Sequence, residues 1–167
     1  TTASHNNAVG SQALQNNTTG ANNNSMGYQA MMFNTTASNN TAIGNLALKY
    51  NTTGGNNTAL GYQVLDSNTT ASENTGVGHN TLSSNTTGAG NLGVGYQVLA
   101  NNTTANYNTG VGYDALNDNT TGTENVALGA FALDANTTAS YNVAIGKGAL
   151  TANTTGAWNT AVGHNAL

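Results

Sequence analysis

Asn51-Thr-Thr-Gly-Gly-Asn-Asn-Thr-Ala-Leu-Gly-Tyr-Gln-Val-Leu-Asp-Ser67 is one copy of a 17-residue unit that runs through the chain without an insertion. Counted from the Asn of Asn-Thr-Thr, position 11 of the unit is Gly in all ten copies, from Gly10 to Gly163. A short fixed period over many copies is typical of a solenoid, in which each repeat is one structural unit that packs on the next. The period predicts a single elongated repeat domain over residues 1–167 and favours a structural protein over an enzyme.

The length and composition of the unit favour strands over helices. Repeats built from two helices need about 33 to 34 residues, and the repeated Gly and Asn-Thr-Thr would interrupt a helix. Residues 142–146 and 61–65 are short extended candidates, and Asn-Thr-Thr with Gly or Ala is a turn by composition. We expect an all-β parallel β-solenoid (β-roll) of ten coils about 4.8 Å apart, with two strands and two turns per coil.

The fixed apolar positions define the expected core. Position 10 is aliphatic or Met in every copy, from Val9 to Val162, and position 15 is Leu, or Met31 once. We expect both positions to face inward, while the small residues at position 9 pack closely against another strand or a second chain. Because such a core is thin, ladders of identical Asn and Thr side chains and self-association are expected to add stability.

A 34-residue period lies within the 17-residue one. Position 4 alternates between Ala and Gly, from Ala3 to Gly156, and Ser follows four of the five Ala residues but none of the Gly residues. Two interpretations stay open. Alternate coils adopt two turn conformations, one of which needs Gly, or a pair of coils was duplicated without structural consequence.

Two Asn positions are repeated, and only one of them lies regularly in a glycosylation sequon. Asn at position 1 always has Thr two residues later, so decoration of these Asn residues on an exposed turn, or of the adjacent Thr hydroxyls, is one hypothesis. A turn with an Asn ladder is the other, because branched glycans about 4.8 Å apart would crowd one another. The candidate glycosylation residues are Asn17, Asn34, Asn51, Asn68, Asn85, Asn102, Asn119, Asn136 and Asn153. Position 7 predicts a structural ladder of Asn6, Asn23, Asn40, Asn57, Asn74, Asn91, Asn108, Asn125, Asn142 and Asn159.

Other classes of site are not indicated by the sequence. Charged residues make up 5% of the chain and the net charge is −4, so no nucleic-acid footprint is expected, and no apolar run is long enough for a membrane-spanning helix. His5, His79 and His164 lack ligand spacing, the calcium-binding nonapeptide of β-rolls is absent, and no Ser, His and Asp arrangement suggests a nucleophile. We therefore expect no catalytic residue, cofactor or metal. The tyrosines of position 12 are either a stripe for glycans or receptors, or a row formed by packing or by an inter-chain contact. They are Tyr28, Tyr62, Tyr96 and Tyr113.

The repeated core resembles a known family. Asn-Val-Ala-Ile-Gly at residues 142–146 and Asn-Thr-Ala-Ile-Gly at residues 40–44 are similar to the Ser-Val-Ala-Ile-Gly core of YadA-like head repeats in trimeric autotransporter adhesins. The whole unit also resembles Asn-Thr-rich arrays of bacterial surface and phage tail-fibre-domain proteins. The resemblance implies a parallel β-roll, left-handed and trimeric in the adhesin heads. The 17-residue coil departs from the adhesin coil of about 14 residues.

These observations lead to three functional hypotheses. The first is a structural extracellular filament or fibre shaft, glycan-decorated on its Asn-Thr-Thr turns and self-associating side by side or end to end. The second is an adhesin or tail-fibre segment that binds a host surface, and the third is an ice-binding solenoid. All place the protein outside the cell, on a cell surface or on a virion. Because neither end shows an atypical capping repeat, we expect the chain to be a segment of a longer array.

Overall fold

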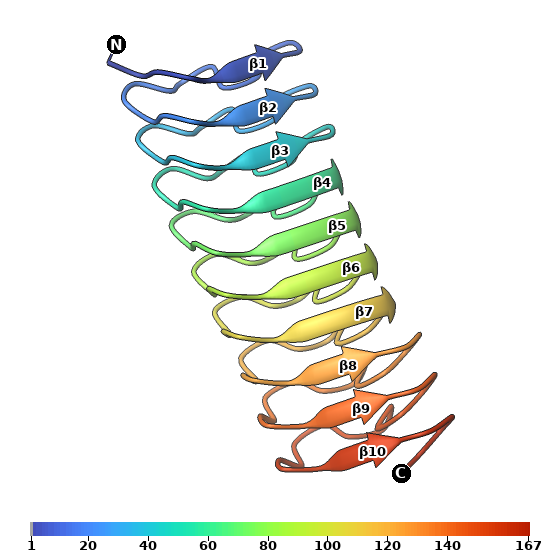
Figure 1. Ribbon diagram of the computed structural model, residues 1–167. Helices are drawn as coiled ribbons and strands as arrows, with labels where there is room; N and C mark the ends of the chain where they lie inside the picture. The colour runs from blue at the N-terminus through green and yellow to red at the C-terminus, as the bar shows by residue number, and fades with distance from the viewer. Residues whose placement is uncertain (1) are drawn as a thin grey trace.

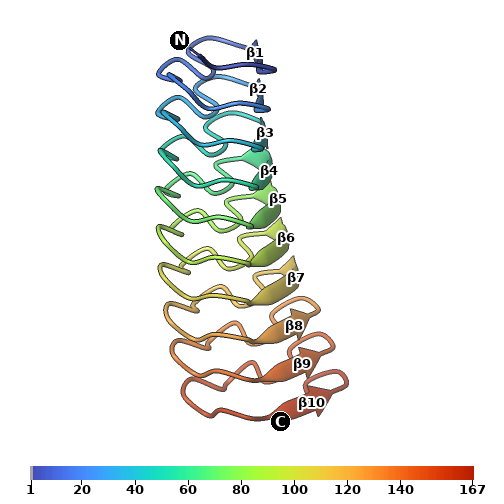
Figure 2. The same cartoon turned by 60° about the vertical axis from the view of Figure 1, so that its left-hand side comes forward.

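The computed structural model describes residues 2–167 and contains ten parallel strands in one sheet, ordered as in the chain. The coils stack into a rod with the sheet along one side (Figures 1 and 2). The strands are β1 (Asn7–Val9), β2 (Asn24–Met26), β3 (Thr41–Ile43), β4 (Thr58–Tyr62), β5 (Thr75–His79), β6 (Leu92–Tyr96), β7 (Thr109–Tyr113), β8 (Val126–Leu128), β9 (Val143–Ile145) and β10 (Thr160–Val162). Each residue pairs with its equivalent one repeat later, as Thr58 does with Thr75. The predicted all-β solenoid is therefore confirmed.

The prediction of two strands per coil is wrong. Within residues 2–167 each coil has one strand, and the segment 61–65 leaves β4 after Tyr62. Gln63 and Leu65 have φ angles of 50° and 53°, in the left-handed region that a strand cannot contain. Their amides still find partners, because Gln63 N–H donates to Asn45 O in the preceding coil (3.0 Å) and Leu65 N–H to Thr81 O in the following coil (3.1 Å). Inter-coil hydrogen bonds thus replace a second sheet.

The interior of each coil is lined by positions 9, 14 and 15. Leu65, Leu82 and Leu99 at position 15 are fully buried, as expected from the sequence. The expectation for position 10 is wrong, since Val9 and Leu128 are 57% and 47% exposed. Neighbouring residues of a strand face opposite sides, and the narrow interior accepts only the small residue of position 9. The larger aliphatic side chain of position 10 therefore faces outward.

Side-chain volume in the core is matched between successive coils. Where position 14 is Val or Thr, position 9 of the next coil is Gly, and where position 14 is Ala, the next position 9 is Ala or Ser. A Cβ atom added to Gly110 would lie 2.5 Å from Cγ1 of Val98, and one added to Gly93 would lie 2.5 Å from Cγ2 of Thr81. The Gly residues thus make room for the branched side chains of the preceding coil.

Position 11 requires Gly for two reasons. Gly112 has a φ angle of 143°, which L side chains rarely adopt. A Cβ atom at this position would also lie 2.6 Å from the carbonyl oxygen of Gly129 in the next coil. The same two constraints explain why the 17-residue Gly period has no exception within the array.

The alternation at position 4 has a structural cause. A Cβ atom on Gly122 would overlap the carbonyl oxygen of Ala139 in the next coil and lie 2.6 Å from Asn119 Oδ1, so alternate coils need Gly for close approach, not for a positive φ angle. The Ser that follows Ala also acts between coils, because Ser140 Oγ accepts a hydrogen bond from Thr123 N–H at 2.9 Å. Where Ser is replaced, Asn106 Oδ1 accepts the equivalent bond. The pair of coils is thus a structural unit.

Candidate functional surface

The Asn residues of position 7 form a buried ladder along the rod. Asn74 Oδ1 accepts a hydrogen bond from the backbone N–H of Asn91, one coil further on, at 2.9 Å. Asn74 Nδ2 donates to the carbonyl oxygen of Gly88 at 2.9 Å. The same pair of bonds recurs through the interior coils, so one side chain satisfies two backbone groups that would otherwise be buried without a partner.

The Asn residues of position 1 form a second ladder, and the expectation that they are exposed is wrong. Asn85 is fully buried, and its Nδ2 donates to the Gly88 carbonyl oxygen (2.9 Å) and to Asn68 Oδ1 (3.0 Å). A glycan on this nitrogen would require the turn to unfold. The fully buried members are Asn34, Asn51, Asn68, Asn85, Asn102, Asn119 and Asn136, whereas Asn17 and Asn153 are partly buried. The structure therefore favours the ladder interpretation of Asn-Thr-Thr.

The two ladders meet at the carbonyl oxygen of position 4. Gly88 O accepts hydrogen bonds from Asn85 of its own coil and from Asn74 of the preceding coil. A buried polar network of this kind specifies one register when it is fully paired, and it is costly when one member is lost. The Asn residues that the sequence singled out are thus part of the internal framework of the rod and not of its surface.

A row of apolar side chains that face solvent lies on the outer face of the sheet. We call the position-10 side chains the outer apolar row; they are Val9, Met26, Ile43, Leu60, Val77, Val94, Val111, Leu128, Ile145 and Val162. They range from partly buried to 67% exposed at Val162. Position 8, on the same face, is Asn, Thr, Leu or Val, so neither row contains a charge. Continuous exposed apolar patches are typical of contact surfaces in soluble proteins.

An aromatic stack borders the outer apolar row at the C-terminal ends of β4 to β7. The rings of Tyr62, His79, Tyr96 and Tyr113 stack in succession, with centroids 5.1, 5.2 and 5.0 Å apart. Phe131 continues the stack edge-on at 5.3 Å. Because each inner ring covers the face of its neighbour, the faces on which a sugar would stack are occupied. The arrangement favours packing over a glycan-binding stripe for this part of position 12.

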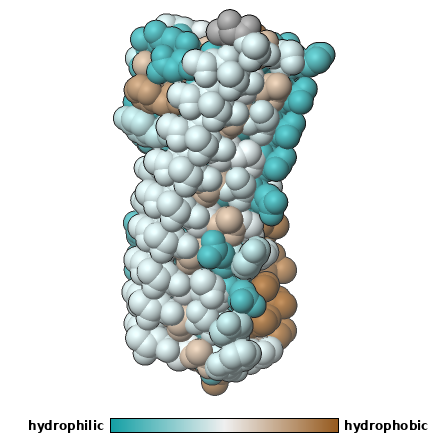
Figure 3. All heavy atoms as spheres, turned by 90° about the vertical axis from the view of Figure 1, so that its left-hand side faces the viewer, coloured by the Kyte–Doolittle hydropathy of each residue, from teal (hydrophilic) through white to brown (hydrophobic). Residues whose placement is uncertain are grey.

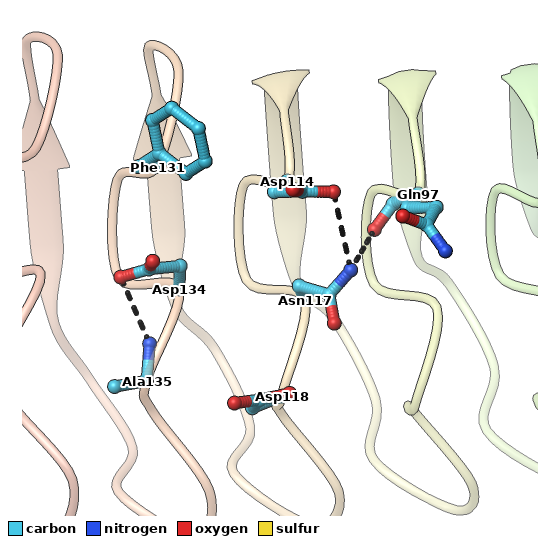
Figure 4. Close-up of a pocket in the computed structure, with 7 residues that line it drawn as sticks. All are labelled: Gln97, Asp114, Asn117, Asp118, Phe131, Asp134 and Ala135. Atoms are coloured by element: carbon cyan, nitrogen blue, oxygen red, sulfur yellow. Dashed lines mark hydrogen bonds between the residues drawn. The ribbon is translucent and has the colours of Figure 1, made fainter.

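A small acidic pocket lies between neighbouring coils near Phe131 (Figure 4). Asn117 Nδ2 donates to Asp114 Oδ1 at 3.3 Å and to the Gln97 carbonyl oxygen at 3.0 Å. Burial raises the pKa of Asp114; the Asn117 hydrogen bond opposes the rise, and the charges of Asp134 and Asp118 add to it. Among residues 2–167, no three His, Cys, Asp or Glu side chains are placed to hold a metal ion.

The remaining candidate residues are dispersed. His5 and His164 lie in the first and last coils, and His79 takes part in the aromatic stack. Residues 2–167 contain no helix with the length and hydropathy of a membrane span.

Comparisons with protein-family models, curated proteins and solved structures found no match to this chain.

Proposed function

We propose that this chain is a shaft segment of an extracellular structural fibre and that copies associate side by side through the outer face of the sheet. The observation that carries this proposal is the outer apolar row. It is uncharged and continuous from β1 to β10, and it is exposed toward both ends of the rod and partly exposed from β4 to β7, although the rest of the surface is rich in Asn, Thr and Ser.

The size of the face fits a weak contact between a single pair of copies. Ten strands about 4.8 Å apart make it about 48 Å long. Four strands, β4 to β7, cover positions 8 to 12, about 13 Å, and the other six end at position 10, after about 7 Å. The face therefore offers about 450 Å² per copy, or about 900 Å² for a pair, which is the size of a weak or transient interface. Oligomers are thus expected to form as the concentration of the chain rises.

A second copy suits this face better than an unrelated partner. The outer apolar row repeats at the strand spacing, so two parallel copies present identical ridges and grooves to each other. No charged side chain at position 8 or 10 would be buried without a partner when the faces meet. The stacked rings of Tyr96 and Tyr113 would extend the contact at one edge.

The proposal is tested by the size of the purified chain in solution. Sedimentation and electron microscopy of the unmodified protein should show lateral oligomers or fibres. The double variant Val94→Glu and Val111→Glu places two charges on the face and should shift the protein to monomers while its circular dichroism is retained.

Asn56→Glu is the matched control for an added charge. Asn56 is exposed at position 6, where the chain itself carries Glu73 and Glu124, so this variant should assemble like the unmodified protein. A chain that stays monomeric up to high concentration, or Glu variants of the face that assemble normally, would contradict the proposal.

A further inference from the structure

The second Thr of every Asn-Thr-Thr turn is exposed. This row occupies position 3 of the unit, and all nine of its members in Asn-Thr-Thr turns are exposed: Thr19, Thr36, Thr53, Thr70, Thr87, Thr104, Thr121, Thr138 and Thr155. The turns lie on the left-hand side of Figure 1, and that side shows a long band of near-neutral hydropathy in Figure 3. The row is therefore a column of accessible hydroxyl groups along the rod.

No side-chain hydrogen bond within the described fold explains why position 3 is always Thr. The first Thr of each turn has a structural task, as in Thr86, whose Oγ1 donates to the carbonyl oxygen of Thr103 at 3.0 Å. Between residues 2 and 167 no hydroxyl of the second Thr forms a hydrogen bond with another protein group. The backbone N–H of Thr87 bonds to Thr103 O, a bond that any residue other than Pro would make.

Duplication does not explain the constancy of this position either. Other exposed positions have diverged between coils; position 6, for example, is Asn39 in one coil, Gly90 in another and Trp158 in a third. If the copies were identical only because they are recent, position 6 would be as uniform as position 3. The requirement for Thr thus comes from something outside the folded chain.

We propose that the second Thr of each turn is the acceptor for an O-linked sugar. This inference rests on the proposed extracellular structural function and specifies how the surface of the fibre is modified. In the reaction, the Thr hydroxyl oxygen attacks the anomeric carbon of a phosphate-activated sugar, and the bond from that carbon to the phosphate oxygen breaks. The phosphate leaves with the electron pair, and the hydroxyl proton passes to a base of the transferase.

The spacing of the row selects the kind of modification. Successive hydroxyls lie one strand spacing apart, about 4.8 Å, so single sugars or unbranched chains fit in every coil and branched ones do not. Phosphate groups on the same hydroxyls would place up to two negative charges on each neighbour at this distance, where repulsion is strong. Neutral sugars avoid that repulsion and would coat the rod with a hydrated layer.

The direct test is mass spectrometry of the protein isolated from the organism that makes it. Fragmentation that preserves glycosidic bonds should locate sugar masses on the second Thr of the interior turns, with Thr86 and its equivalents unmodified. A chain with the unmodified mass of 16.8 kDa overturns this inference. Sugars found only on other residues overturn it as well. In either case the fibre proposal still stands or falls by the assembly of the unmodified chain.

A matched pair of variants tests the premise in unmodified recombinant protein. Thr86→Val removes the inter-coil hydrogen bond and should lower the melting temperature. Thr87→Val is the same change one residue later and should leave the melting temperature unaltered. An equal loss of stability in both variants would mean that the second Thr has a structural role, and the inference would then lose its basis.

Discussion

Replacing Gly110 by Ala tests whether core volume is matched between neighbouring coils. The new Cβ atom would lie 2.5 Å from Cγ1 of Val98, about 1 Å inside the optimum separation of two carbon atoms. Overpacking of this kind costs about 1–3 kcal/mol of unfolding free energy. Val98→Ala, in the same contact, removes two buried methyl groups and should cost about 1–3 kcal/mol by itself.

The double variant Val98→Ala with Gly110→Ala should lose less unfolding free energy than the two single variants lose in sum. The added methyl group occupies part of the space that Val98 leaves, and Ala is favoured over Gly within a strand by about 0.5–1 kcal/mol. The chain already contains this combination, because Ala47 at position 14 is followed by Ala59 at position 9. We therefore expect a favourable coupling energy of about 1–3 kcal/mol between the two changes.

Denaturant unfolding followed by circular dichroism, on the four proteins of the cycle, measures this coupling. All four should have the same strand signal at low denaturant, so that the comparison concerns stability alone. If the two single effects add within about 0.5 kcal/mol, the volume-matching explanation of Gly at position 9 is refuted.

Three further predictions concern single residues. Asn85→Ala should lower stability strongly, because each buried group left without its partner costs about 1–3 kcal/mol. Thermal melting against Asn16→Ala, at an exposed position outside the left-handed region, checks it, and equal effects of the two variants would contradict the buried ladder. Gly112→Ala should destabilise by at least about 1–3 kcal/mol, since it combines a positive φ angle with a clash against Gly129 O; a melting temperature equal to that of the unmodified protein would contradict this. Burial raises the pKa of the Asp66 carboxyl group, and the charge of Lys49 opposes the rise. The folded chain therefore binds the carboxyl proton more tightly than the unfolded chain does. The resulting stabilisation is lost as the pH rises through the raised pKa. Asp66→Asn should therefore raise the melting temperature at about pH 7 but not at about pH 3, below the ordinary pKa of Asp, and an equal gain at both would refute the assignment.

The burial of the position-1 Asn residues could not be predicted, because the sequon pattern is the same whether its Asn is buried or exposed. Asn85-Thr-Thr meets the sequon pattern, yet the Asn side chain points into the coil and holds the turn carbonyl of Gly88. The spacing of three residues between Asn85 and Gly88 suits a local hydrogen bond from side chain to backbone. This spacing is the feature of the sequence that indicates an inward-facing Asn. The accessible hydroxyl of Thr87 belongs to the same motif, two residues later.

The two strands expected per coil are a second example. Gly61 to Leu65 has the composition of a strand, but the chain turns sharply there and places Gln63 and Leu65 in the left-handed region. Residues of these types rarely adopt that conformation alone. It persists here because both amides bond to adjacent coils, and those partners exist only once the rod has formed.

The sequence alone predicts the solenoid, the parallel in-register pairing and the burial of Leu at position 15, because identical short units can stack in the same way only if equivalent residues meet. The correlation of Val98 with Gly110 is also present in the sequence, but its cause, the contact between these two residues, is visible only in the structure. Which side of each strand faces inward depends on how the whole coil is packed. Strand alternation makes positions 9 and 10 face opposite ways, but the width of the coil interior decides between them. That width is set by backbone paths and Asn ladders that bind one coil to the next, and it leaves room for the small side chain and turns the large apolar one outward.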